Sequence, residues 1–136
     1  MAELLAPVDA ESLAIDYLND GGDLAPASGK RPHDWQAGDP WIRVTRIGGV
    51  PNDGIGHLDR ARLQVEAYDA DEPTAFASAG AALTKLRLLP SSGFEFAGAV
   101  VTGVDQDLGM TNSPDPETGA DRYLFGVVLY VHPVES

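Results

Sequence analysis

Hydrophobic and polar residues alternate in the segment "WIRVTRI", residues 41–47. Ile42 and Val44 fall on one side of an extended chain, and Arg43 and Thr45 fall on the other. A second alternating segment spans residues 61–69, with Leu63, Val65 and Ala67 on one side and Arg62, Gln64, Glu66 and Tyr68 on the other. This period of two is typical of strands with one face in the core and the other in water or at an interface.

Two other segments repeat their hydrophobic residues at helical spacing. A first helix is predicted over residues 8–19 from the shared face of Leu13, Ala14, Tyr17 and Leu18. Asp9 is a suitable N-cap for this helix, and Gly21-Gly22 ends it. A second, alanine-rich helix is predicted over residues 73–89, with a buried stripe of Phe76, Ala79, Leu83 and Leu86. Pro90 ends this second helix.

The second half of the chain predicts two more strands. "FAGAVVTGVDQD", residues 96–107, is the third predicted strand, and "RYLFGVVLYVH", residues 122–132, is the fourth. The fourth is mostly apolar on both faces, with Tyr123, Phe125, Val127, Leu129 and Val131 on one and Leu124, Val128 and Tyr130 on the other. A strand of this kind lies in the middle of a sheet or beneath a partner.

Two segments contain Gly and Pro but no hydrophobic period, and they predict long loops at about residues 21–40 and 106–121. Such loops are usually functional or mobile, and we expect both to gain order on assembly. The whole chain, residues 1–136, is therefore expected to form one α+β domain in the order α-β-β-α-β-β. The expected architecture is a mostly antiparallel four-stranded sheet with two helices packed on one face.

Composition narrows the classes of function. The chain has 21 Asp and Glu against nine Lys and Arg, and its net charge of -12 argues against tight binding of nucleic acid. It has no cysteine, which excludes disulfides, a thiol nucleophile and a cysteine-based zinc site. No apolar run is long enough to span a membrane, and the N-terminal segment does not resemble a secretory signal. We therefore expect the chain to act in a cytoplasm or in an assembly built there.

Four carboxylates gather where the second strand leads into the second helix: Glu66, Asp69, Asp71 and Glu72. They could bind a cation. However, Pro73 favours the first turn of a helix, and acidic residues there satisfy free N–H groups and the helix dipole. Asp69 and Glu72 also have the spacing of a capping box. We therefore interpret this cluster as a helix cap and predict no metal site.

No other pattern predicts catalysis. His33, His57 and His132 lack a metal-ligand spacing, although His57 and Asp59 could line a small-ligand pocket. Ser78, Ser91 and Ser92 lack the setting of a nucleophile elbow. Asp115, Glu117 and Asp121 lack the order of an EF-hand loop and are expected to be solvated. We predict a protein that is not an enzyme and needs no cofactor.

Two tryptophans flank the first long loop. Trp41 is expected to begin a core strand. For Trp35, the sequence allows two roles: a surface side chain or an anchor at an interface.

The overall pattern resembles the tail terminator (tail completion) proteins of long-tailed bacteriophages. The similarity rests on Gly48-Gly49 after the first strand, Leu58-Asp59 and Tyr68 in the second, the alanine-rich helix, and Arg122-Tyr123 in the last strand. It covers residues 8–132 as a pattern, and no single motif is diagnostic. The resemblance implies a structural virion protein that forms a ring, usually of six subunits, at the head-proximal end of the tail.

In that family the ring caps the tail tube, ends its polymerisation and offers the surface that meets the head–tail connector. The implied partners are therefore further copies of the chain, the tail tube protein and a connector or neck protein. DNA would pass through without specific binding, and no membrane is involved. Assembly would take place in the host cytoplasm.

A ring of identical subunits needs two different patches on each subunit. The expected interface residues are Arg43, Arg46, Arg60, Arg62 and Tyr130. Two alternatives remain open: another neck or head–tail adaptor protein of the same virion, and a small cytoplasmic ligand-binding or enzymatic α+β domain.

Overall fold

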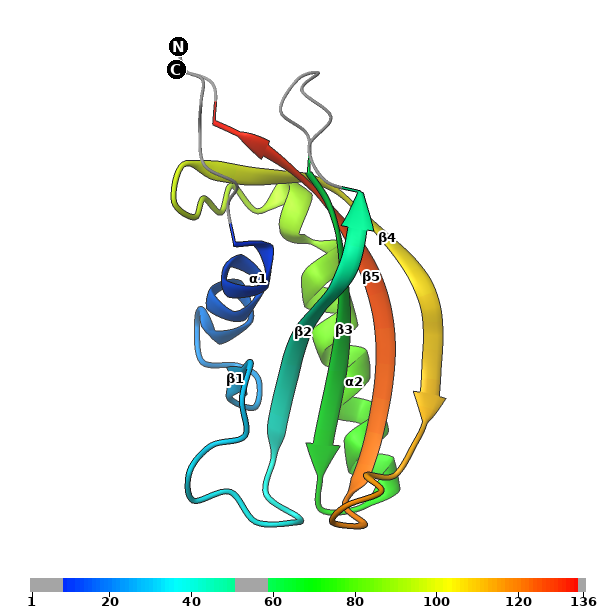
Figure 1. The fold of residues 1–136 in the computed structure, drawn as a ribbon. Coiled ribbons are helices and arrows are strands. Elements are labelled where there is room, and N and C mark those ends of the chain that lie inside the picture. Colours follow the sequence, from blue (N-terminus) through cyan, green and yellow to red (C-terminus); the bar gives the residue numbers. More distant parts are fainter. Residues whose placement is uncertain (1–8, 51–58, 135–136) are drawn as a thin grey trace.

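The computed structural model describes residues 9–50 and 59–134 of the chain (Figure 1). Its elements follow in the order α1 (Ala10–Asn19), β1 (Ala27–Ser28), β2 (Trp41–Val50), β3 (Asp59–Asp69), α2 (Glu72–Arg87), the 3-10 turn η1 (Leu89–Ser91), β4 (Ala99–Asn112) and β5 (Asp121–Pro133). The predicted α+β class and the two helices are confirmed. None of the helices in this part of the chain has the length and hydrophobicity to cross a membrane.

The sheet has five strands in the order β1-β2-β3-β5-β4. Three neighbouring pairs are antiparallel, whereas β1 runs parallel to β2. The prediction of four strands was therefore wrong by one. Strand β1 has only two residues and no hydrophobic period, and its position depends on the side chain of Asn19. That amide donates to the carbonyl of Ala27 and accepts from its N–H, both at 2.9 Å.

Both helices contribute to a single core on one face of the sheet. In Figure 1, α2 runs behind β3 and β5, and α1 lies beside β2. Register explains why the core is continuous, because Val65 on β3 pairs with Val44 on β2 and with Phe125 on β5. The fully buried members from the two helices are Ala10, Leu13, Ala14, Leu18, Ala79, Ala82 and Leu86.

The ends of both helices differ in detail from the prediction. Asp9 is the N-cap of α1 as predicted, and its carboxylate accepts from the N–H of Ser12 at 3.1 Å. Helix α2 ends at Arg87, two residues before the predicted end. The 3-10 turn η1 follows it. The prediction for Phe76 was wrong, since 52% of this side chain is exposed. It lies at the margin of the helix–sheet contact, edge-on to the ring of Tyr123 with 5.2 Å between centroids.

Strand β4 is displaced from its predicted position. It begins at Ala99 and continues to Asn112, so that residues 106–112 of the predicted loop belong to the strand. Residues Ala97 and Gly98 have φ values of 52° and 81° and form a turn before it. Register shifts between Val101 and Gly103, and again twice between residues 106 and 111, interrupt the alternation. These bulges hid the end of the strand from a search for a period of two.

The two edges of the sheet are unlike. On the β2 side, a carboxylate oxygen of Glu11 accepts from the backbone N–H of Arg46 at 2.9 Å, which occupies a donor at the strand edge. Gly29 makes this close approach possible, because a Cβ there would lie 2.8 Å from the other oxygen of Glu11. On the far side, β4 pairs with β5 and forms the other edge.

Candidate functional site

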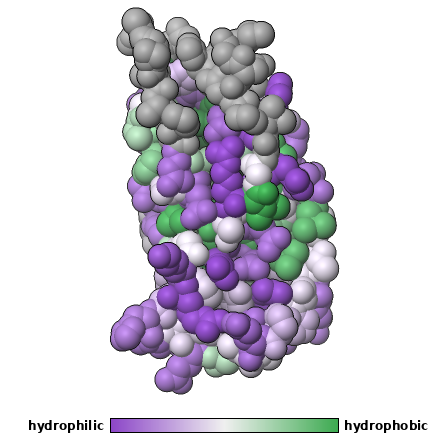
Figure 2. Space-filling view, viewed as in Figure 1, coloured by the Kyte–Doolittle hydropathy of each residue, from purple (hydrophilic) through white to green (hydrophobic). Residues whose placement is uncertain are grey.

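The face of the sheet opposite the helices, here called the open face, carries a group of arginines. By register, Arg43 on β2, Arg60 and Arg62 on β3 and Arg122 on β5 point to this face. They are four of the seven arginines in the chain. In Figure 2, hydrophilic residues dominate this side of the molecule, with a few hydrophobic ones between them. The open face can be followed near the centre of that view.

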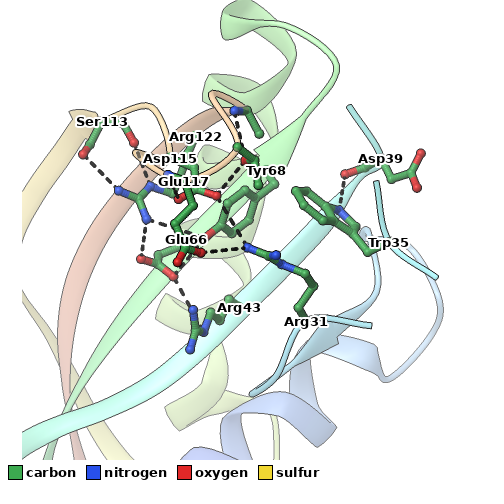
Figure 3. A network of polar contacts seen from close by, with 12 residues as sticks. Arg31, Trp35, Asp39, Arg43, Glu66, Tyr68, Ser113, Asp115, Glu117 and Arg122 are labelled. Atoms are coloured by element: carbon green, nitrogen blue, oxygen red, sulfur yellow. Dashed lines mark hydrogen bonds and ion pairs between the residues drawn. The ribbon is translucent and has the colours of Figure 1, made fainter. Parts of the chain in front are cut away.

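A buried ion pair lies at the lower end of the open face (Figure 3). Nη1 of Arg122 donates to Oε2 of Glu66 at 3.0 Å, and only 13% and 9% of these side chains are exposed. Nε of Arg122 donates to the carbonyl of Ser113 at 2.7 Å, which ties the β4–β5 connection to the sheet. Glu66 also accepts from Gln64 at 3.1 Å. Both charges are therefore paired and hydrogen-bonded, as burial requires.

Beside this pair, three aromatic rings pack together. Trp41 stacks on Tyr68 with 4.8 Å between centroids, and Trp35 meets both rings at 5.6 and 5.5 Å. Trp41 and Tyr68 are almost fully buried, and burial raises the pKa of the Tyr68 phenol. The indole N–H of Trp41 donates to Ser28 Oγ on β1 at 2.8 Å. Trp35 therefore anchors the first long loop to the sheet of its own subunit.

Arg31 joins the same loop to the β4–β5 connection. Its guanidinium lies 3.6 Å from a carboxylate oxygen of Asp115 and 3.6 Å from one of Glu117, and 5.1 Å from the centroid of the Trp35 ring. The Asp115 carboxylate accepts from the hydroxyl of Thr118, which with lesser contributions from Arg122 and Arg31 lowers the pKa of Asp115. The two long loops thus meet over the buried pair.

Further along the open face, one ion pair spans three strands. Nε of Arg62 on β3 donates to Oδ2 of Asp107 on β4 at 2.7 Å. The strand between them is β5, and Asp107 passes over Gly126, where a Cβ would lie 2.5 Å from its Oδ1. Glycine in the middle of β5 therefore leaves room for this crossing. Arg62 is exposed as predicted, but its charge already has a partner within the subunit.

Arg43 differs from Arg62 in its bonding. Its Nε is shielded from solvent and has no hydrogen-bond partner in the part of the chain that the structure describes. The nearest acidic oxygen, Oε1 of Glu66, lies 3.9 Å away. The Arg43 side chain as a whole is 41% exposed. A buried donor without an acceptor is costly, so the Nε of Arg43 is a poorly satisfied group on the open face.

The three other expected interface residues lie apart from Arg43. Arg46 sits on the helix side of β2 and holds Asp59 through two hydrogen bonds of 2.9 Å, which raise the pKa of its guanidinium. Tyr130 donates to Asp105 Oδ2 at 2.7 Å, and its ring lies against Gly103. The hydrogen bond to Asp105 raises the pKa of the Tyr130 phenol. Arg60 faces Tyr130 across the β3–β5 pair.

The carboxylates before α2 separate into different roles. Asp71 is the N-cap: its Oδ1 accepts from the N–H of Thr74 at 2.9 Å and from the hydroxyl of the same residue, which lowers its pKa. The expected capping box with Asp69 was wrong, because Asp69 accepts from the N–H of Ala70 instead. Glu72 accepts from Asn112 and Tyr123 on the last two strands. Glu66 is part of the buried pair.

Other candidate residues are dispersed. His57 lies outside the described residues, and Asp59 is engaged by Arg46. His132 is paired with Val100 on the edge strand. Among residues 9–50 and 59–134, no three His, Asp or Glu side chains gather in a metal-binding arrangement.

The comparisons with known proteins leave the chain without an assigned family. No protein-family model matches its sequence, and no curated protein matches it at a significant level.

Sequence reasoning missed the pairing of Arg122 with Glu66 and the role of Arg31. The signal for the pair was partly present, since Arg122 is a charged residue in a mostly apolar strand and Glu66 is an acidic residue on the outward face of its own strand. No local pattern pointed to Arg31, because its partners lie more than 80 residues away in sequence. The assembled site is a largely buried cluster of Trp, Tyr and Arg side chains at the lower end of the open face.

Proposed function

We propose that this chain is the tail terminator subunit of a long-tailed bacteriophage. Six copies form a ring that caps the tail tube, ends its polymerisation and provides the surface that joins the head–tail connector. The protein is structural and has no enzymatic activity or cofactor. It resides at the head-proximal end of the virion tail after assembly in the host cytoplasm.

The observation that carries the proposal is Arg43 on the open face. An apolar sheet face covered by helices needs no partner, but here the opposite face carries an arginine whose Nε is shielded and lacks an acceptor in the described residues. The Arg43 side chain as a whole is 41% exposed, which leaves it able to meet a carboxylate of another chain, and charge pairs of this kind set register and specificity. It adds to the sequence resemblance, which suggested arginines of these strands as contacts between subunits.

Charge distribution favours a second copy of the chain as that partner. Four arginines lie on the open face, while the chain as a whole has 21 acidic against nine basic residues. Arg62 and Arg122 are paired with Asp107 and Glu66 within the subunit, so Arg43 and Arg60 are the arginines of this face for which the carboxylate-rich remaining surface of a second copy is a complement. Contact between two unlike patches of identical subunits is heterologous, and it closes into a ring when the rotation between neighbours allows it.

Arg43→Glu is the variant that tests this contact. In native mass spectrometry, we expect the wild-type chain to form a closed ring, alone or on tail tubes, and Arg43→Glu to remain monomeric and folded. Arg87→Glu makes the same charge change on α2, outside the open face, and should assemble as the wild type does. Arg62→Glu is a poorer choice, because it would place a second carboxylate beside Asp107 within the subunit.

A phage that lacks the protein gives the decisive biological test. We expect tails of uncontrolled length that fail to join heads. Tails of normal length attached to heads would contradict the proposal. Tails of normal length that fail only at the head junction would instead identify a neck adaptor.

A further inference from the structure

The connection between β1 and β2, residues 29–40 and here called the strap, crosses the lower end of the open face. Its two ends are fixed to the sheet: the indole N–H of Trp41 bonds to Ser28 Oγ, and Ser28 Oγ in turn donates to the carbonyl of Lys30. Between these ends, Trp35 lies on Trp41 and Tyr68, and Arg31 reaches the β4–β5 connection.

The strap has its own internal structure. The indole N–H of Trp35 donates to the carbonyl of Asp39 at 2.9 Å, and the carboxylate of Asp39 accepts from the N–H of Gln36 at 3.0 Å. Gly38 has a φ of 102°, a backbone conformation that glycine adopts without strain. These bonds keep Trp35 and its turn together, so that the strap can move as one piece about its fixed ends.

The ion pairs of Arg31 are the polar contacts that hold the middle of the strap, beside the packing of Trp35. Both pairs have a separation of 3.6 Å; Arg31 is 43% exposed, Glu117 is 79% exposed and Asp115 is 8% exposed. The pair with Glu117 is therefore exposed, and pairs of this kind are weak and are screened by salt. The Arg122–Glu66 pair beneath them is buried and is therefore screened much less. The strap thus closes over a rigid surface through a weaker set of bonds.

We propose that the strap is a latch, held shut by Arg31 against Asp115 and Glu117, that opens reversibly and uncovers the Trp41–Tyr68–Arg122 surface. Closed, it keeps Trp35 on that surface and joins the two long loops. Open, it leaves exposed a cluster of Trp, Tyr and Arg, the residue types that contribute most to protein interfaces. This inference stands apart from the proposed ring function and holds for the single subunit.

The chain carries its own reporter of the latch. It has two tryptophans, Trp35 and Trp41, and both belong to this cluster. In Arg31→Glu, we expect a red-shifted tryptophan emission, easier quenching by acrylamide and faster hydrogen exchange over residues 29–40. Far-UV circular dichroism should keep the wild-type signature. Raising the salt concentration should shift the wild-type emission towards that of the variant.

Two further variants make the test specific. Lys30→Glu places the same charge change one residue away and should retain the wild-type emission. In Trp35→Phe, a smaller salt-dependent shift should remain, because Trp41 is then the one reporter left and is uncovered when the strap opens. Arg31→Gln removes the charge without reversing it and should open the strap partly.

The proposal is overturned if folded Arg31→Glu and Arg31→Gln show wild-type emission, quenching and exchange. It is also overturned if Lys30→Glu opens the strap equally, since net charge of the loop would then be the cause. If both Arg31 variants lose their far-UV signature, Arg31 supports the fold itself, and the latch is rejected.

Discussion

Arg122 donates to Glu66 from a diagonal position on the neighbouring strand, with 3.0 Å between Nη1 and Oε2. Both side chains are largely buried, although they point away from the helix-covered core. Two loops, rather than a helix, shield them from water. The open face of the sheet therefore has a sheltered lower end and an exposed centre. Substitutions in these two regions are expected to have different effects on stability.

Arg122→Met should destabilise the protein by about 3 kcal/mol, because it leaves the buried Glu66 without its cationic partner. The double variant Glu66→Gln/Arg122→Met should lose less than the sum of the two single variants, since no uncompensated charge remains. Urea unfolding of the four proteins measures both quantities. Strict additivity would contradict the view that the pair acts as one unit.

Asp71→Ala should cost about 1 kcal/mol, because the N–H of Thr74 loses its cap at the start of α2. Asp71→Asn keeps a capping oxygen and should retain most of the stability. Thermal or urea unfolding of both variants checks this difference. Tight, stoichiometric calcium or magnesium binding by the wild type, lost in Asp71→Ala, would show that the cap interpretation is wrong.

Gly126→Ala should destabilise the protein by about 1–2 kcal/mol, because its new methyl group would meet Asp107 Oδ1 at 2.5 Å and Leu108 Cβ at 3.0 Å. The Arg62–Asp107 pair should break. Gly109→Ala on β4 is the matched control, since nothing lies within 4 Å of its added Cβ. Comparable losses in the two variants would mean that strand propensity, and not the crossing carboxylate, determines the cost.

Acid should weaken the fold through Asp115. The pKa of this carboxyl is lowered in the folded protein, mainly because it accepts from the Thr118 hydroxyl. A lowered folded pKa means that the stabilisation is fully present above the ordinary pKa of 3.8 and is lost as pH falls through the folded value. In Asp115→Asn, the slope of unfolding free energy against pH should be shallower below pH 4. An unchanged slope would assign the acid sensitivity to other carboxyls.

The sequence predicted secondary structure best where hydrophobic residues recur at a fixed spacing over several helical turns or several residues of a strand. Strands β2, β3 and β5 and both helices were found because their buried residues recur at fixed spacing, as Leu63 and Val65 do. Strand β1 was missed because two residues carry no period, and it depends on a side chain eight residues earlier. The end of β4 was assigned to a loop because bulges shift its register three times.

The site was harder to predict than the fold because its contacts join distant segments. Outward positions of Arg43 and Arg62 followed from alternation, but alternation does not reveal that Asp107 reaches Arg62 across another strand. The cap was assigned to the correct cluster, but spacing did not decide between Asp69 and Asp71, which are both acceptable acceptors before Pro73. Phe76 satisfied the helical period but falls at the boundary of the buried stripe, where sequence spacing alone does not determine burial.

The Glu11 carboxylate at the edge of β2 has a consequence for how this chain behaves at high concentration. Growth of a fibre by strand addition requires each molecule to present two free edges, one for each neighbour. The carboxylate of Glu11 accepts from a backbone N–H at the edge of β2, and β1 pairs with the start of that strand. This edge of the sheet is therefore partly occupied. Within the described residues, association by strand addition is therefore expected to favour the β4 edge, and Glu11 limits it on the β2 side.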